Sequence, residues 1–186
     1  TFQVAKRVRS ETNIGGHAVS VSSAAVDLAK KIFEPLQERD ALLIGAGEMA
    51  ELAAEHLLGN GVRCINVANR TFERAVNMAD RFGGRAFGMD DLPAALAQSD
   101  IVIASTGSSA AVITLATAKA ALKKRKGRPI IFIDNAVPRD VEAAVGGLDG
   151  CFVYDMDDLS QVVEHNVAAR AGEAGQAERI VAAEVV

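Results

Sequence analysis

The sequence predicts a doubly wound α/β domain, in which helices cover both faces of a parallel sheet. Short and almost continuously apolar runs, typical of strands buried on both faces, alternate with segments of helical periodicity. The chain has 186 residues, 49% of them hydrophobic and 24% charged, and this length suffices for one domain with a full core. We expect the strand order 3-2-1-4-5-6, which is the default for such a sheet.

The individual elements follow from this alternation. A first helix is expected at 19–33, after serines that can cap it, and Pro35 stops it. Apolar runs predict strands at 41–45, 63–68, 84–88, 100–106, 129–134 and 151–155, of which 84–88 is the weakest. Helices are expected at 48–60, 71–83, 90–98, 113–126 and from 157 to about 186.

The last helix is longer than a cover for the sheet requires, so it fits a helix that connects domains. We therefore expect three regions: an N-terminal linker and helix at 1–36, the sheet domain at 37–156, and a long C-terminal linker helix at 157–186. The chain begins at Thr1 and its last segment lacks a helix stop signal, which is typical of a domain excised from a longer protein.

Charge and hydropathy argue against a nucleic-acid-binding protein and against a membrane or exported protein. The net charge of −4 argues against a surface that neutralises many phosphates, since nucleic-acid-binding surfaces are normally basic. There is no apolar run of about 18 residues and no signal-peptide pattern, so we expect a cytoplasmic protein without a membrane partner.

The cysteines and histidines predict neither a metal site nor a catalytic centre. Cys64 and Cys151 lie inside apolar runs and form no CxxC pair, so we expect two buried free thiols in a reducing compartment. His17, His56 and His165 lack the spacing of metal ligands, and they form no Ser-His-Asp or Cys-His arrangement.

The stretch "GAGEMA", residues 45–50, follows the first strand of the sheet and opens a helix. It matches the G-x-G-x-x-A turn of Rossmann-type NAD(P)-binding domains, in which the first glycine permits the tight turn, the second lets a pyrophosphate approach, and the alanine allows close packing. The helix start then offers free N–H groups to the phosphates. The alternative is a glycine turn without a ligand. The candidate cofactor residues here are Gly45, Ala46, Gly47, Glu48, Met49 and Ala50.

The stretch "NRTFER" follows the second strand, where the adenosine ribose of a dinucleotide lies. NAD-selective domains carry an acidic residue there, but this chain carries Asn69, Arg70, Thr71 and Arg74. A guanidinium can bind a 2′-phosphate through its planar fork, so NADPH is the expected cofactor. Alternatively, Thr71 only caps the next helix and the arginines are solvated.

Two further loops lie at the carboxyl edge of the predicted sheet. Ser105, Thr106 and Gly107 are small residues that leave room for the nicotinamide ribose, unless they form a plain polar loop. Asp134, Asn135 and Arg139 lie around Pro138 after the fifth strand, and their role stays open.

The basic stretch "KKRKGR", residues 123–128, is similar to a nucleic-acid-binding patch. Cations at the end of a helix are also favoured by the helix dipole, so we interpret these side chains as solvated.

A set of motifs in this order resembles the central region of the glutamyl-tRNA reductase family. The motifs are "VRSETNIGGHAVSVSSAAVDLA", "IGAGEMAELAAEHL", "ANRTFERA", "DIVIASTGS", "IDNAVPRDVE", "VYDMDDLSQVVEHN" and "AARAGEAGQAERIVAAEV", and together they cover essentially the whole chain. The resemblance implies an NADPH-dependent oxidoreductase that reduces glutamyl-tRNA to glutamate-1-semialdehyde for porphyrin and other tetrapyrrole synthesis.

The resemblance also implies parts that this chain does not contain. The family has an N-terminal catalytic domain with a nucleophilic cysteine, an NADPH-binding domain, and a C-terminal dimerisation domain joined by a spinal helix. Neither Cys64 nor Cys151 matches the motif of that nucleophile, so no catalytic residue is assigned here. Binding of glutamyl-tRNA and formation of a homodimer are expected of the absent domains, and the isolated fragment is expected to be inactive.

Two rival functions stay open. A shikimate-type dehydrogenase also combines a glycine turn with an Asn-Arg-Thr stretch, but it requires a substrate domain with a catalytic lysine, and the roughly 40 residues before the first strand leave no room for one. A non-catalytic dinucleotide-sensing module is the other rival.

Overall fold

The computed structural model describes residues 20–45, 47–168 and 181. Six parallel strands form one sheet in the order β3-β2-β1-β4-β5-β6, as predicted. The strands are β1 (Asp40–Ile44), β2 (Cys64–Ala68), β3 (Ala86–Phe87), β4 (Ile101–Ala104), β5 (Ile130–Asp134) and β6 (Cys151–Asp155). Every residue of β4 and β5 is buried, because helices lie on both faces of these central strands.

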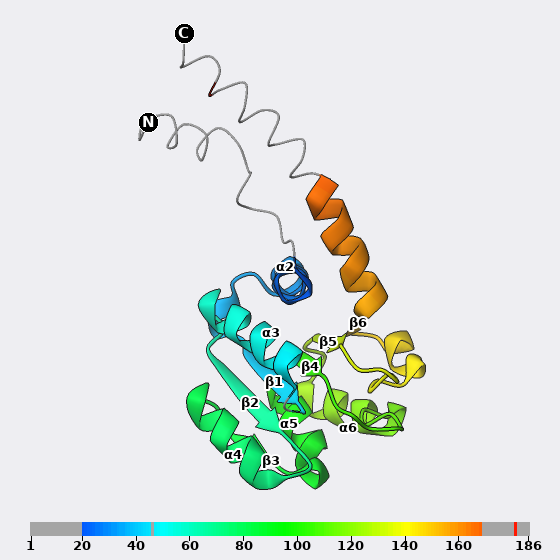
Figure 1. Ribbon diagram of the computed structural model, residues 1–186. Helices are drawn as coiled ribbons and strands as arrows, with labels where there is room; N and C mark the ends of the chain where they lie inside the picture. Colours follow the sequence, from blue (N-terminus) through cyan, green and yellow to red (C-terminus); the bar gives the residue numbers. More distant parts are fainter. Residues whose placement is uncertain (1–19, 46, 169–180, 182–186) are drawn as a thin grey trace.

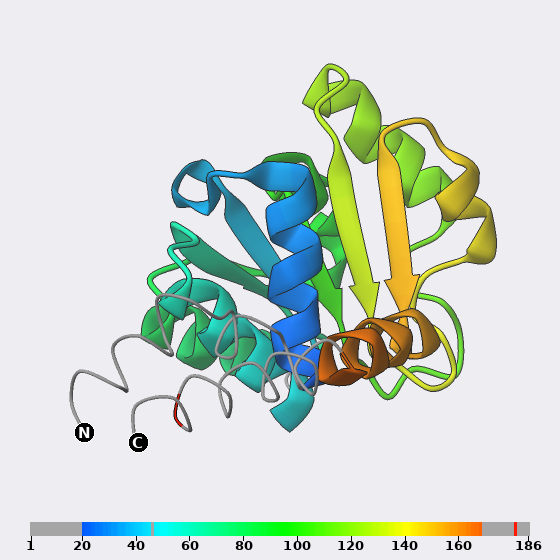
Figure 2. The ribbon, with the colours of Figure 1, turned by 90° about the horizontal axis from the view of Figure 1, so that it is seen from above.

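One face of the sheet is covered by three helices near the first strands, namely α2 (Val21–Phe33), α3 (Glu48–Gly59) and α4 (Phe72–Arg81). Figure 2 shows α2 lying over the sheet beside α3, and residues 156–168 form a further helix that crosses the ends of β5 and β6. In Figure 1 this last helix leads away from the sheet.

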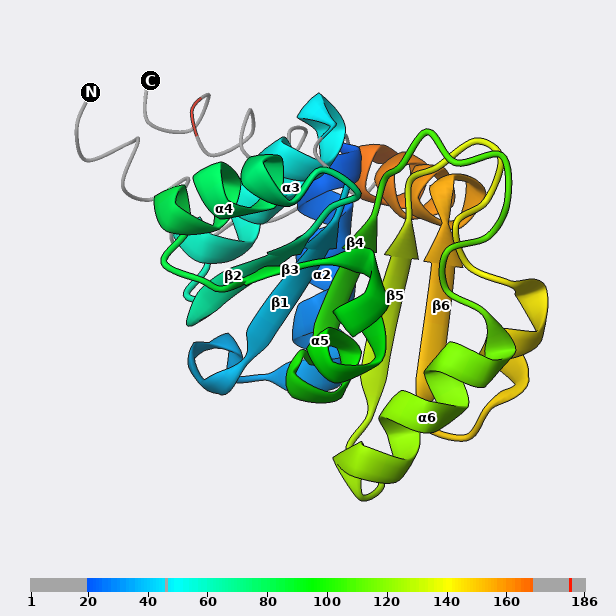
Figure 3. The same cartoon turned by 90° about the horizontal axis from the view of Figure 1, so that it is seen from below.

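The other face is covered by α5 (Leu92–Gln98), α6 (Leu115–Arg125) and a short 3-10 helix, η3 (Ala143–Gly147), as Figure 3 shows for α5 and α6. Alternate residues of each strand serve the two cores: Leu43 and Ile103 pack under α2 and α3, whereas Leu42 and Val102 pack under α5 and α6.

The helix boundaries have local causes. The Ser20 hydroxyl accepts a hydrogen bond from the Ser23 N–H at 3.2 Å and caps α2, which ends at Phe33, two residues before Pro35. Thr114 caps α6 in the same way, and α6 ends at Arg125, followed by the C-cap Lys126, which adopts a left-handed conformation with φ 54°.

The predicted elements differ from the structure mainly at their ends. The fourth strand stops at Ala104 rather than residue 106, and residues 89–91 form a separate 3-10 turn, η2 (Met89–Asp91), before α5. Two further 3-10 helices, η1 (Leu36–Glu38) and η3, were not predicted, because neither carries a helical period long enough to recognise.

Candidate functional site

The candidate site lies at the carboxyl edge of the sheet, where the chain order of the strands reverses. β1 pairs with β2 on one side and with β4 on the other, so the loops that follow β1 and β4 leave the sheet side by side. In open α/β sheets a crevice at this position is where ligands bind.

Gly45 is the residue at which the first loop turns, and no other residue type fits there. Its φ of +92° is left-handed, and a Cβ on it would lie 2.3 Å from the carbonyl oxygen of Ser105. The Gly45 N–H donates to the Ala68 carbonyl, and the Ser105 N–H donates to the Ile44 carbonyl. The loops after β1 and β4 are thus held against one another.

Gly47 precedes the first turn of α3 and leaves the start of that helix open. It has no side chain to cap the helix, and a Cβ there would lie 3.3 Å from the Ser105 Oγ. The first N–H groups of α3 are therefore available to an anion. Glu51, in the same first turn, forms an ion pair with Arg81 at 2.5 Å, so its negative charge is countered.

The remaining residues of this turn are only partly described. Ala46 lies outside the described residues, whereas Glu48, Met49 and Ala50 form the start of α3. Glu48 is exposed.

The second stretch of predicted site residues follows β2 at the same edge. Asn69 is half-buried, and its Nδ2 donates to the Thr71 carbonyl at 3.2 Å. Arg70, Thr71 and Arg74 are exposed, and within the described residues neither arginine forms an ion pair. Thr71 occupies the N-cap position of α4, but its hydroxyl makes no capping hydrogen bond, so the alternative that it serves only as a cap is not supported.

The loop after β4 is organised by Asp140, a residue that sequence reasoning missed. The Asp140 carboxylate accepts hydrogen bonds from the Thr106 N–H at 2.7 Å and the Thr106 hydroxyl at 2.5 Å, and the Thr106 Oγ1 accepts the Ser108 N–H. The pKa of Asp140 is raised overall. Burial is the main cause and the nearby Asp134 adds to it, while the hydrogen bonds from Thr106 act in the opposite direction. Gly107 is exposed, with nothing near its missing Cβ.

The loop after β5 is tied down by Asp134, which answers the question that the sequence left open for this residue. The Asp134 carboxylate is buried and accepts the backbone N–H groups of Ala136, Asp140 and Val141. Asp134 therefore holds the backbone that carries Asp140, and Asp140 in turn holds Thr106. The sequence did carry one sign of this role for Asp140. It is a second acidic residue only six positions after Asp134, which ends β5.

Asn135 and Arg139 differ in their surroundings. The Asn135 Oδ1 is buried without a hydrogen-bond partner among the described residues, which leaves an acceptor at this edge for a ligand. Arg139 is exposed and forms an ion pair with Asp155 at the end of β6. The pKa of Asp155 is lowered mainly by the backbone hydrogen bond from Asp158, and further by the charge of Arg139 and the backbone hydrogen bond from Asp157.

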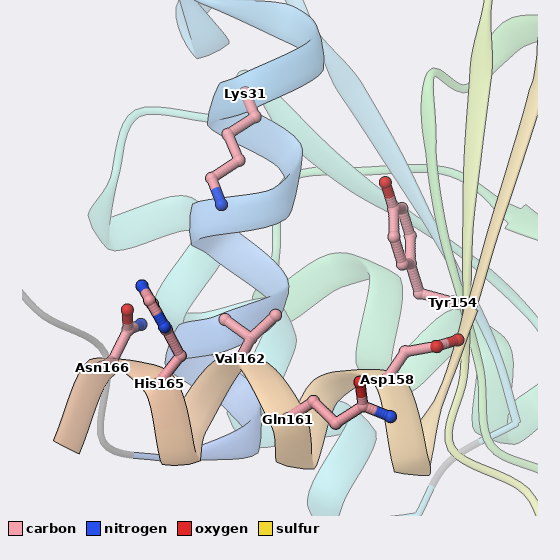
Figure 4. A pocket seen from close by; sticks show the side chains of 7 residues that line it. All are labelled: Lys31, Tyr154, Asp158, Gln161, Val162, His165 and Asn166. Carbon is pink, nitrogen blue, oxygen red and sulfur yellow. The ribbon is translucent and has the colours of Figure 1, made fainter. Parts of the chain in front are cut away.

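A separate hollow lies between α2 and the helix of residues 156–168. Figure 4 shows Lys31 reaching down from α2 toward this helix, which contributes Val162 and His165 to the lining. Asn166, on the same helix, donates to the Asp27 carboxylate at 3.3 Å and ties the two helices together. None of the predicted site residues lines this hollow.

The cysteine prediction is only half right. Both thiols are free and Cys151 is buried, but Cys64 is half-buried, because it begins β2 at the open amino edge of the sheet. Burial, with a hydrogen bond to Asp40, raises the pKa of Cys64 to about 11, and burial also raises the pKa of Cys151. Neither thiol is activated as a nucleophile.

The interpretation of the basic stretch 123–128 is wrong at one residue. Arg125 is 1% exposed rather than solvated, and its guanidinium forms an ion pair with Asp100 at 2.7 Å. It also donates to the carbonyls of Ser99, Arg128 and Pro129. The side chain at this position turns inward under α5, which periodicity alone did not reveal.

The described residues contain neither a metal-binding cluster nor a helix that could span a membrane. Over the described part of the chain, no cluster of three or more histidine, cysteine or acidic side chains could hold a metal ion. Within the same ranges, no helix has the length and apolarity to cross a membrane.

The comparisons with known proteins agree with this architecture. Residues 27–162 match the family model described as shikimate / quinate 5-dehydrogenase. A glutamyl-tRNA reductase of Nitratidesulfovibrio vulgaris (strain DSM 19637 / Miyazaki F) is 54% identical over 180 residues, which are 97% of this chain and 41% of that protein. The chain thus spans less than half the length of this curated relative.

Solved structures are similar over the same region. A glutamyl-tRNA reductase from Methanopyrus kandleri superposes with a TM-score of 0.90 at 41% identity, over 98% of this chain and 46% of that one. The nucleotide-binding domain of a glutamyl-tRNA reductase from Thermoplasma volcanium shares the fold, with a TM-score of 0.62 at 18% identity over 83% of this chain and 98% of that one.

Proposed function

We propose that this chain, which belongs to the shikimate / quinate 5-dehydrogenase family and by its sequence to the glutamyl-tRNA reductases, is the part of such an enzyme that binds NADPH. The observation that carries the proposal is the loop pair at the switch point of the sheet. A Cβ on Gly45 would overlap the Ser105 carbonyl, and Gly47 leaves the first N–H groups of α3 open beside it. A diphosphate fits this backbone cradle, because it needs close approach and N–H donors.

The second part of the proposal is a preference for the phosphorylated adenosine ribose. Arg70, Thr71 and Arg74 are exposed after β2, on the side of the cradle where the ribose of a dinucleotide lies in this fold. A guanidinium can bind a 2′-phosphate with two parallel hydrogen bonds. Asn69 supports this geometry, since its side chain donates to the Thr71 carbonyl and orders the turn.

The third part concerns the nicotinamide end. Ser105, Thr106 and Gly107 line the adjacent loop, and the Asp140 carboxylate holds Thr106 in place through two hydrogen bonds. Asn135 supplies an unpartnered buried acceptor at the same edge. Bound NADPH supplies a hydride, so the work of these residues is to hold the dinucleotide and to fix the direction from which it reacts.

We propose further that the complete protein reduces the glutamyl group of glutamyl-tRNA, and that it does so in the cytoplasm. The relatives that support this activity are more than twice as long as this chain. The nucleophile, the tRNA contacts and the dimer interface are therefore assigned to parts outside it. Of the two rivals, the shikimate-type dehydrogenase is disfavoured, because a glutamyl-tRNA reductase matches nearly the whole chain at 54% identity.

The substitution Arg70→Asp tests the cofactor assignment. We expect the affinity for NADPH to fall by about 10-fold to 100-fold, because a charge-assisted pair is lost and an acidic group faces the 2′-phosphate, while the affinity for NADH changes little. Isothermal titration calorimetry with each cofactor measures the two effects. Lys119→Asp is a control that makes the same change of charge at an exposed position of α6, away from the cradle. Equal losses for NADPH and NADH would contradict the assignment.

A further inference from the structure

The amino edge of the sheet, opposite to the dinucleotide cradle, carries a row of arginines. Arg39, Arg63 and Arg85 each stand directly before a strand, namely β1, β2 and β3, and Arg128 stands two residues before β5. Because the strands are parallel, all of these side chains start from one edge. A protein with a net charge of −4 thus concentrates positive charge at this edge.

Two carboxylates balance only part of this charge. Asp40 binds Arg63 through both of its oxygens, at 2.7 and 2.5 Å. Asp100 is buried and is already paired with the buried Arg125 at 2.7 Å. Arg128 lies 3.6 Å from Asp100 with its side chain 54% exposed, and Arg39 lies 3.9 Å from the same carboxylate. Among the described residues, Arg85 forms no ion pair.

These side chains border a hollow of about 810 Å³. Its charged lining consists of Asp40, Arg63, Arg85 and Arg128, which gives a net charge of +2. Cys64 also lines the hollow, and burial with its hydrogen bond to Asp40 raises its pKa to about 11, so the thiol adds no negative charge near neutral pH.

Two glycines in the lining leave part of one wall of the hollow without side chains. Gly83 and Gly84 lie between α4 and β3, and Gly83 has a φ of +66°. A Cβ on Gly84 would lie 1.8 Å from the Ile65 carbonyl, so this wall can carry no side chain there. The guanidiniums of Arg85 and Arg128 therefore flank a space bounded in part by bare backbone.

We propose that this hollow is a second anion site, distinct from the dinucleotide cradle, and that it binds phosphate groups. A single carboxylate would leave the lining with excess positive charge, whereas a phosphate dianion or two phosphodiesters match a charge of +2. Guanidinium forks pair with phosphate oxygens in a bidentate geometry. The phosphates come from a polynucleotide backbone or from a free polyphosphate, and the two sources are distinguished by experiment.

The test uses the full chain and two probes, inorganic tripolyphosphate and a fluorescein-labelled RNA hairpin, both titrated at an NADPH concentration that fills the dinucleotide cradle of every variant. We expect both Arg85→Ala and Arg128→Ala to weaken binding of at least one probe by about tenfold, since each removes a charge-assisted hydrogen bond. If the RNA is the tighter ligand, the plot of log affinity against log salt concentration should become less steep. The magnitude of its negative slope should decrease by about one for each arginine removed. A tighter tripolyphosphate complex would identify a free polyphosphate as the ligand.

Three controls keep this test separate from the proposed function. Lys119→Ala makes the same change of charge at an exposed position of α6 outside the hollow and should change binding by less than about twofold. Arg70→Asp alters the cofactor edge and should leave tripolyphosphate binding intact, whereas Arg85→Ala should leave NADPH binding intact. Absence of binding to both probes, or a loss that follows Arg70 rather than Arg85 and Arg128, would overturn the second site while leaving the NADPH assignment untouched.

Discussion

Cys64 shows at the residue scale how its surroundings decide what a reactive group can do. Its thiol is half-buried at the start of β2 and donates to the Asp40 carboxylate at 3.2 Å. Partial burial and the neighbouring carboxylate both disfavour the thiolate, which raises the pKa to about 11. The sequence predicts an inert thiol correctly, although it predicts full burial as the reason.

Slow alkylation of Cys64 is the corresponding prediction. In a Cys151→Ala background at pH 8, iodoacetamide should react about a hundredfold more slowly than with free cysteine, because the thiolate fraction is small. The rate should rise about tenfold per pH unit until the pH approaches the pKa. Mass spectrometry of quenched time points measures the rate. Asp40→Asn should accelerate the reaction, and a rate equal to that of free cysteine would disprove the assignment.

Asp134 and Asp140 show what sequence reasoning finds and misses at this scale. Their position at and just beyond the carboxyl end of β5, at the cofactor edge, follows from the parallel sheet. The sequence does not show which carboxylate binds the loop after β4 and which binds the loop after β5. That depends on how residues 135–141 fold back against the sheet. In the structure, the Asp134 carboxylate accepts hydrogen bonds from backbone N–H groups, whereas the Asp140 carboxylate accepts them from Thr106.

At the scale of elements, α6 is fixed to the sheet by a buried ion pair between Arg125 and Asp100. Arg125, in the last turn of α6, reaches Asp100 just before β4 and the carbonyl oxygens around it. Burial lowers the pKa of Arg125, while the hydrogen bond and charge of Asp100 raise it. The pair thus joins a helix to the start of a strand in the centre of the sheet.

The substitution Arg125→Ala should lower the free energy of unfolding by about 3 kcal/mol, because the buried Asp100 would lose its 2.7 Å partner and keep only the more distant Arg128 and Arg39, at 3.6 and 3.9 Å. Chemical denaturation followed by circular dichroism measures the change. Lys124→Ala, at an exposed position of the same turn, is the matched control and should change the free energy by less than about 0.5 kcal/mol. A loss below about 1 kcal/mol for Arg125→Ala would show that this pair does not fix α6.

The long elements were predictable and the short ones were not. Strands such as β4 and β5 are continuous apolar runs, and α2 carries both its cap and its stop in the sequence. The helices η1 and η3 are too short to leave a period, and their backbone is set by the chain around them.

For the whole molecule, the prediction concerns what this chain can do alone. The proposed cofactor site is formed entirely by loops of one sheet, so the purified chain should bind NADPH. We expect no oxidation of NADPH when glutamyl-tRNA is added, because the proposed nucleophile lies in a part of the relatives that this chain does not span.

Absorbance of NADPH at its long-wavelength band follows this reaction directly. Adding back the flanking regions in one polypeptide should restore turnover, and that result would separate a reductase from a module that only senses a dinucleotide. Turnover by the isolated chain would refute the expected division of roles between its parts.

The sequence by itself determined the alternation of strands and helices, the strand order and the glycine turn, because these depend on local periodicity and on the handedness of parallel connections. Tertiary structure decided which charged groups are buried and which loops meet. The Gly45 contact with Ser105 joins residues 60 positions apart, and the Arg125 pair with Asp100 joins residues 25 positions apart. Contacts between segments distant in the chain depend on packing, and no local pattern encodes them.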